Sequence, residues 1–98
     1  MCGIVGYTGN KPAQEIVIES LKKLEYRGYD SSGIALHEGE IVFSKKEGPI
    51  ANLESVLDPS NSRMAIAHTR WATHGVPSDV NSHPHLSNDS KIAVVHNG

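Results

Sequence analysis

The chain has 98 residues, of which 38% are hydrophobic and 20% are charged, and its formal net charge is −2. This balance is typical of one small soluble domain, and the lack of a basic stripe argues against a nucleic-acid or membrane-surface role. No apolar run approaches the roughly 20 residues that span a bilayer, and no signal peptide is evident. The single cysteine excludes an internal disulfide and fits a reducing cytosol, so we expect a cytoplasmic protein.

The N-terminal part of the chain predicts a strand followed by a helix. Residues 2–7 form a short apolar run, and Asn10 is a candidate helix N-cap with Pro12 in the first turn. The helix is expected to break at Gly28. Apolar residues recur at helical spacing and predict its buried face: Ala13, Ile16, Val17, Leu21 and Leu24.

The middle and end of the chain predict further strands and one short helix. Residues 33–37 and 41–45 flank a tight turn and predict an antiparallel hairpin. A short amphipathic helix comes next and ends before Pro59. Residues 64–69 predict another strand, and residues 92–95 predict a last strand that is apolar enough to be buried on both faces. The stretch between these two strands is expected to be mostly loop.

This order of elements predicts an α+β fold. We expect an antiparallel sheet covered by helices on one side, with a second sheet supplied by sequence beyond residue 98. Asn97-Gly98 comes directly after the last strand, and this dipeptide is a turn signal that expects a continuation. We therefore interpret residues 1–98 as the N-terminal part of a longer protein, and expect this part to be inactive when isolated.

Cys2 is the residue that most strongly indicates a catalytic function, as a candidate nucleophile. It comes after the initiator Met1, and a small second residue generally permits removal of Met. The mature chain would then carry a thiol and a free α-amino group on one residue. An α-amino group has a reference pKa of about 7.7–8.0, so it can serve as the base that takes the thiol proton. The alternative is that a lone cysteine is only a small buried hydrophobe.

Polar residues after the strands supply the other groups that amide cleavage needs. The side-chain amide of Asn97 and the backbone N–H of Gly98 would suit an oxyanion hole, although Asn-Gly is also a common turn. The guanidinium of Arg70 would suit a substrate carboxylate, and its alternative is a surface salt bridge. Trp71 beside it is also readable as a core or interface anchor.

Four of the six histidines fall within eighteen positions, which raises the possibility of a metal site: His68, His74, His83 and His85. No cysteine lies nearby, and the spacing matches no common zinc pattern. We therefore expect no metal and no cofactor. We expect His96 to be a buried, hydrogen-bonded strand residue.

Taken together, the motifs resemble the glutaminase domain of the class II, N-terminal-nucleophile, glutamine amidotransferases. They occur along the whole chain in the order and spacing of that family. The matching stretches are Cys2-Gly3-Ile4-Val5-Gly6, Leu24-Glu25-Tyr26-Arg27-Gly28-Tyr29-Asp30-Ser31-Ser32-Gly33, Ala67-His68-Thr69-Arg70-Trp71-Ala72-Thr73-His74-Gly75, Asn81-Ser82-His83-Pro84-His85 and Val95-His96-Asn97-Gly98. The resemblance implies a sandwich of helices packed on antiparallel sheets, incomplete in these 98 residues.

The resemblance also implies catalytic roles. Cys2, after loss of Met1, would form a γ-glutamyl thioester with L-glutamine. Asn97 and the N–H of Gly98 would form the oxyanion hole. Arg70 would bind the α-carboxylate of glutamine.

The resemblance implies supporting roles for further residues. The loop that closes over glutamine would contain Trp71, Thr73, His74 and Gly75. Arg27 would help to orient Cys2, with Asp30 in support. An acidic residue beyond Gly98 would bind the α-amino group of the substrate.

Within the family, Tyr26-Arg27-Gly28-Tyr29-Asp30 and Trp71-Ala72-Thr73-His74-Gly75 favour members that pass ammonia to fructose 6-phosphate for hexosamine synthesis. That acceptor would bind a further domain outside this chain, in a protein that forms a homo-oligomer. Members that pass ammonia to phosphoribosyl pyrophosphate are one alternative. A non-catalytic glutamine-binding module is another, and it would not require a free N-terminal cysteine.

Overall fold

The computed structural model describes residues 2–71 and 82–96. Their elements are β1 (Gly3–Thr8), α1 (Ala13–Leu24), the 3-10 helix η1 (Glu25–Arg27), β2 (Ser31–His37), β3 (Ile41–Glu47), α2 (Ile50–Glu54), β4 (Met64–Arg70), β5 (His85–Leu86) and β6 (Ala93–Val94). The order agrees with the predicted one, except that β5 lies in a stretch that was expected to be loop.

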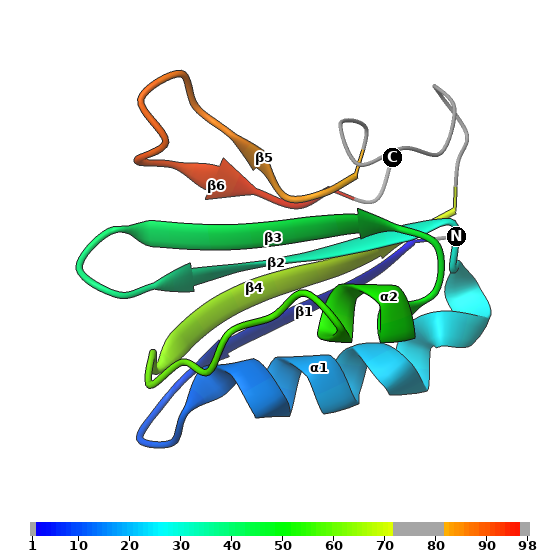
Figure 1. The fold of residues 1–98 in the computed structure, drawn as a ribbon, viewed down its shortest axis with the longest axis horizontal. Helices are drawn as coiled ribbons and strands as arrows, with labels where there is room; N and C mark the ends of the chain where they lie inside the picture. Colours follow the sequence, from blue (N-terminus) through cyan, green and yellow to red (C-terminus); the bar gives the residue numbers. More distant parts are fainter. Residues whose placement is uncertain (1, 72–81, 97–98) are drawn as a thin grey trace.

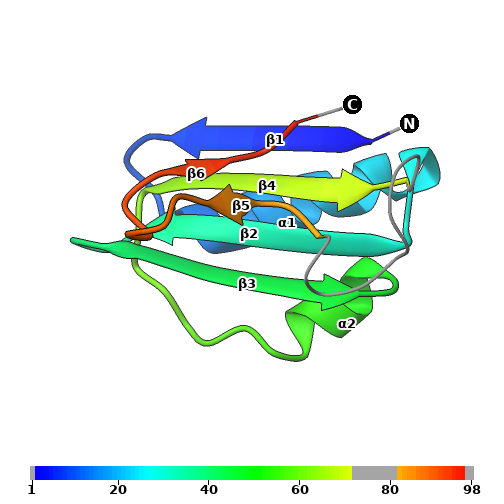
Figure 2. The same ribbon diagram turned by 90° about the horizontal axis from the view of Figure 1, so that it is seen from above.

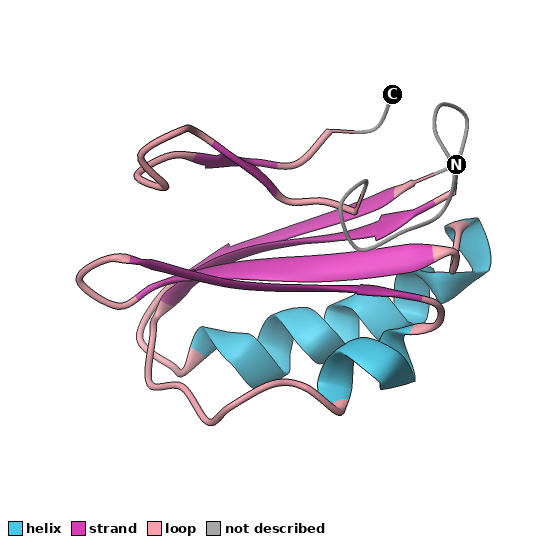
Figure 3. Ribbon diagram, turned by 45° about the horizontal axis from the view of Figure 1, so that its top comes forward, coloured by secondary structure: helices cyan, strands magenta, loops and turns pink. Residues whose placement is uncertain are grey.

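The core of the fold is a four-stranded antiparallel sheet in the order β1-β4-β2-β3. Both α-helices cover one face of this sheet, and the small β5–β6 hairpin lies over the opposite face (Figure 1). Seen from above, β5 and β6 run over the middle strands (Figure 2). The helices therefore form one layer, the sheet a second, and the hairpin the start of a third (Figure 3).

The hydrophobic core lies between α1 and the sheet. Alternate residues of a strand point to opposite faces, so Ile34 and Leu36 of β2 face the helix while Gly33 and Ala35 face the hairpin. The predicted helix face is largely confirmed: Ala13, Val17 and Leu21 are buried, whereas Ile16 and Leu24 are half-buried. Ile18 is also buried, and its position was not expected to be.

Two predictions at element ends are wrong. α1 begins at Ala13 with Pro12 as its N-cap and no side-chain capping bond, so Asn10 does not cap it. The last strand is only two residues long, and 67% of Ile92 and 54% of Val94 are exposed, so it is not buried on both faces. The reason is that β6 pairs only with β5 among the described residues, and nothing described covers its outer face. Within the same residues, no helix is long and apolar enough to cross a membrane.

Candidate active site

Cys2 lies at one end of the sheet, immediately before β1. Its side chain is buried, with 6% exposed. Gly3 pairs with Thr69, so a continuation of this antiparallel register brings Cys2 opposite Arg70. The Sγ atom of Cys2 donates a hydrogen bond of 3.9 Å to the carbonyl oxygen of Trp71. The thiol is therefore anchored where β4 ends.

Arg27 reaches the same place from η1. Its Nε atom donates a hydrogen bond of 3.0 Å to the carbonyl oxygen of Cys2. This contact fixes the backbone that carries the thiol, because a guanidinium is a planar and always charged donor. Arg27 thus contacts the residue that it is expected to orient. Its role in catalysis stays a prediction.

The turn after η1 is held tightly against the end of β4. A Cβ atom on Gly28 would lie 2.7 Å from backbone atoms of Arg70 and Trp71, so this close approach requires glycine. The hydroxyl of Thr69 donates a hydrogen bond to the carbonyl of Gly28. The backbone N–H of Asp30 donates to the carbonyl of Arg70 over 3.1 Å. These contacts join the turn and the strand end into one unit.

Asp30 supports this unit through its own neighbours. Its carboxylate accepts a hydrogen bond of 3.0 Å from the hydroxyl of Ser31, and its carbonyl accepts one of 2.7 Å from the N–H of Gly48. Asp30 therefore links the start of β2 to the end of β3. These bonds give Asp30 a structural place in the site, which fits the supporting role expected for it.

Arg70 and Trp71 leave β4 in different environments. Only 6% of Arg70 is exposed, so the alternative of a surface salt bridge does not fit the structure. Half of Trp71 is exposed, which also excludes a core anchor within the described residues. Its ring meets that of Tyr29 edge to face, with centroids 6.2 Å apart. A buried guanidinium beside an open aromatic pair is an arrangement that can receive a small carboxylate.

The remaining predicted site residues lie outside the described residues. They are Thr73, His74 and Gly75 of the expected closing loop, and Asn97 and Gly98 of the expected oxyanion hole. The loop and the oxyanion hole therefore remain predictions from the sequence.

A stack of histidines borders the site on the face opposite the helices, and the sequence did not reveal it. His68 and His83 are stacked with ring centroids 4.1 Å apart, and His85 tilts against His83 at 4.3 Å. Burial, with the charges of its neighbours, lowers the pKa of His83 to about 4. Burial likewise lowers the pKa of His68 and of His85. The described residues contain no group of three or more potential metal ligands in a suitable arrangement.

His96 differs from its expectation. It is exposed and lies just beyond β6 rather than within a buried strand. Its hydrogen bond is made by the main chain, since its carbonyl oxygen lies 2.8 Å from Nε2 of His68. The prediction of a hydrogen-bonded residue is confirmed and that of burial is wrong.

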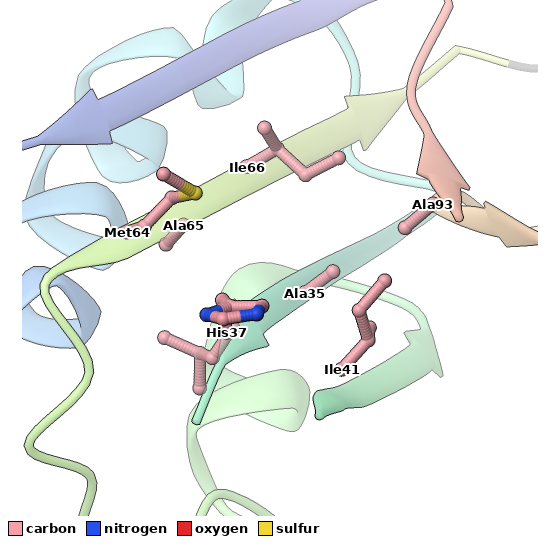
Figure 4. Close-up of a pocket in the computed structure, with 8 residues that line it drawn as sticks. Ala35, His37, Ile41, Met64, Ala65, Ile66 and Ala93 are labelled. Atoms are coloured by element: carbon pink, nitrogen blue, oxygen red, sulfur yellow. The ribbon is translucent and has the colours of Figure 1, made fainter. Parts of the chain in front are cut away.

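An apolar pocket among the described residues lies away from this site. It has a volume of about 190 Å³ and opens between the sheet and the hairpin (Figure 4). Its lining includes His37 at the end of β2, Met64 at the start of β4 and Ala93 of β6. Arg70 stands at the other end of β4, about 13 Å along the strand from the nearest lining residue of β4, Ile66, at roughly 3.3 Å per residue. The pocket therefore lies far from Cys2.

The chain is similar in sequence to one kind of enzyme and in structure to another. No model of a known protein family matches the chain. It is 60% identical over 101 aligned residues to a glutamine–fructose-6-phosphate aminotransferase (isomerizing) from Clostridium perfringens, and 50% identical over 103 residues to one from Chlorobaculum tepidum. Both alignments cover the whole chain but only 17% of the relative, so the chain spans about a sixth of the length of these relatives.

Solved structures show the same fold. A glutamine phosphoribosylpyrophosphate amidotransferase from B. subtilis, complexed with ADP and GMP, superposes with a TM-score of 0.71 at 26% identity. A structure described as the allosteric regulatory enzyme of purine biosynthesis superposes with a TM-score of 0.77 at 28% identity. Each match covers 91% of this chain and 20% of the other. The chain thus has the α+β, N-terminal-nucleophile type of fold, in part.

Proposed function

We propose that this chain, which belongs to the class II glutamine amidotransferases, is the glutamine-hydrolysing part of a glutamine–fructose-6-phosphate aminotransferase. Residues 1–98 would be the N-terminal part of its glutaminase domain, with the rest of that domain and the sugar-phosphate domains in further sequence. The observation that carries the proposal is the buried Cys2, whose backbone carbonyl is held by Arg27 and whose thiol bonds the Trp71 carbonyl, at the strand end that carries Arg70.

The proposed reaction begins with Cys2 as the first residue of the mature chain. Its α-amino group takes the thiol proton, and Sγ attacks the carboxamide carbon of glutamine. The S–C bond forms first and gives a tetrahedral intermediate with a negatively charged oxygen. The C–N bond then breaks as the protonated amine gives its proton to the departing NH2 group, which leaves as ammonia. Water then cleaves the thioester, giving glutamate and the restored thiol. No metal or cofactor takes part in this sequence.

The other site residues act on the substrate rather than on the thiol. Arg70 binds the α-carboxylate of glutamine, and its burial strengthens that interaction because water competes less for the guanidinium. Asn97 and the N–H of Gly98 stabilise the oxyanion. The loop that contains Trp71, Thr73, His74 and Gly75 closes over the substrate.

The acceptor is proposed to be fructose 6-phosphate, which receives the ammonia and yields glucosamine 6-phosphate. The difference in identity supports this choice, since the aminotransferases are 50–60% identical to this chain while the two phosphoribosylpyrophosphate-type structures are 26–28% identical. The full-length protein would act as a homo-oligomer. A reduced thiol as reacting group suits the cytoplasm, where thiols are kept reduced.

Acceptor-dependent glutamate release from the full-length gene product tests the proposal. Fructose 6-phosphate should stimulate release and phosphoribosyl pyrophosphate should not. The reverse pattern would identify the second candidate, an amidophosphoribosyltransferase-like enzyme. Cys2→Ala should abolish hydrolysis while leaving glutamine binding intact, whereas glutamine binding without hydrolysis by the wild type would identify a binding module.

A further inference from the structure

His68 makes a contact that the proposed reaction does not yet use. Its side chain is fully buried, two residues before Arg70 on the same strand, so the two side chains share the face opposite the helices. Nε2 of His68 lies 2.8 Å from the carbonyl oxygen of His96. A carbonyl oxygen only accepts hydrogen bonds, so Nε2 carries the proton of this bond.

The surroundings of the buried His68 ring favour its neutral form. Burial is the main cause that lowers its pKa, and the charges of Arg70 and His85 lower it further, against the opposite effects of the His96 carbonyl and Asp30. Nδ1 of His68 has no hydrogen-bond partner among the described residues. A neutral ring with its proton on Nε2 explains both the hydrogen bond at Nε2 and the lack of a partner at Nδ1, which then carries only a lone pair.

The position of the ring is fixed by the segment that covers it. The ring of His83 is stacked on that of His68 at 23° between planes. The backbone of His83 in turn sits directly on Gly33, where a Cβ atom would come within 1.8 Å of the His83 carbonyl oxygen. Gly33 pairs with His68 across β2 and β4, so the covering segment is seated on the strand beside the ring. His68 is therefore a donor whose direction is set by its surroundings.

The carbonyl of His96, which accepts this bond, is joined directly to the segment expected to form the oxyanion hole. This carbonyl and the N–H of Asn97 belong to one planar peptide group. The bond from His68 fixes the carbonyl end of this peptide group. A side chain two residues from Arg70 thus holds the backbone at His96, the last residue before the expected oxyanion-hole pair in the sequence.

We propose that His68 is a positioning residue for glutamine hydrolysis, which holds the carbonyl of His96 directly before Asn97 and Gly98, the expected oxyanion-hole residues. This inference rests on the proposed function. It assigns to His68 no contact with glutamine, so losing the bond should impair the chemical step and spare substrate binding.

The test compares His68→Phe with His68→Gln in the full-length gene product. Phenylalanine keeps the ring and its stacking but removes the donor, whereas glutamine places an amide N–H near the position of Nε2. We expect His68→Phe to lower kcat for glutamate release roughly 10- to 100-fold, since a misplacement of about 1 Å can cost on the order of 100-fold. KM for glutamine should stay within about threefold, and His68→Gln should recover most of kcat.

The matched control is His37→Phe, the same substitution at an exposed histidine at the far end of β2, which should leave kcat unchanged. A His68→Phe variant with wild-type kcat would overturn the inference. So would equal losses in His68→Phe and His68→Gln accompanied by a raised KM, because that pattern indicates packing alone. A wild type that releases no glutamate would instead refute the proposed function.

A second pair keeps the test decisive if His68→Phe does not fold. Asparagine in place of His68 is polar like glutamine but one carbon too short to reach the His96 carbonyl. We expect His68→Asn to lose kcat relative to His68→Gln at equal melting temperature. Equal kcat values for these two variants would contradict the positioning role.

Discussion

The contact between Gly33 and the His83–Pro84 segment allows one prediction to be worked out in detail. A Cβ atom added to Gly33 would lie 1.8 Å from the carbonyl oxygen of His83 and 2.8 Å from Cδ of Pro84. The carbonyl is backbone, so it has to retreat by about 1.6 Å to reach the 3.4 Å at which ordinary contact begins. Overpacking of this kind costs roughly 1–3 kcal/mol. We therefore expect Gly33→Ala to lift this segment from the sheet and to destabilise the fold.

Gly6→Ala provides the matched control. Gly6 lies in β1 on the same face of the sheet, and an added Cβ atom would meet nothing within 4 Å. Replacement of glycine by alanine at a compatible position stabilises a protein by about 0.4–1 kcal/mol, because the unfolded chain loses freedom. The free energies of unfolding of the two variants should therefore differ by roughly 1–4 kcal/mol.

The assay is calorimetry of the full-length variants, combined with hydrogen exchange read in peptides from β2 and residues 82–86. Gly33→Ala should melt several degrees below Gly6→Ala, since 1 kcal/mol corresponds to about 2–4 °C in a domain of 150–250 residues. Exchange should rise in both peptides of Gly33→Ala alone. Equal melting temperatures and unchanged exchange would refute the argument that Gly33 seats this segment.

Three further predictions concern the side chains of Arg70, Ser62 and His83. Arg70→Lys should mainly raise KM for glutamine, because lysine lacks the bidentate fork, and an unchanged KM would remove Arg70 from carboxylate binding. Ser62→Ala should lower the free energy of unfolding by about 1–3 kcal/mol in denaturant titrations, because the buried Ser62 hydroxyl donates its one proton to the carbonyl of His37, at 2.6 Å, or of Met64, at 2.9 Å. Ser55→Ala, at an exposed serine, should cost much less, and equal costs would contradict this reading. The pKa of His83 is about 4 in the folded chain and 6.5 ordinarily, so the unfolded chain binds a proton first as pH falls. Stability should thus be lost between pH 6.5 and 4. The full shift corresponds to roughly 3.4 kcal/mol, and the expected loss is smaller, about 1–2 kcal/mol, because solvent screens this partly exposed ring. His83→Phe should flatten this part of the pH profile, and an unflattened profile would assign the loss to other groups.

The sequence predicted the main layers of the fold because their signals are local. The apolar spacing of α1 and the tight turn between β2 and β3 each act over a few residues, and these three elements formed close to their expected bounds. The prediction of helices on a single face also held. The failures came where a local signal competed with tertiary packing. Asn10 is a good N-cap residue, yet the helix begins three residues later.

The surroundings of the candidate site were harder to predict than its members. Cys2 and Arg70 were identified from their chemistry and Arg27 from the family resemblance, and the structure brings these three together at one end of the sheet. The stacking of His68 and His83 depends on a backbone approach over a glycine in another strand, which no periodicity reveals. A glycine between serine and isoleucine inside a strand was the available signal, since such a glycine often marks a close approach.

The central claim is that Cys2 is an N-terminal nucleophile, and intact mass spectrometry of the full-length gene product tests it most directly. The mass is measured before and after treatment with an electrophilic glutamine analogue, and the modified residue is mapped by fragmentation. The account predicts a chain that lacks Met1 and gains a single analogue, on Cys2. A chain that retains Met1 and remains unmodified at Cys2 would contradict it.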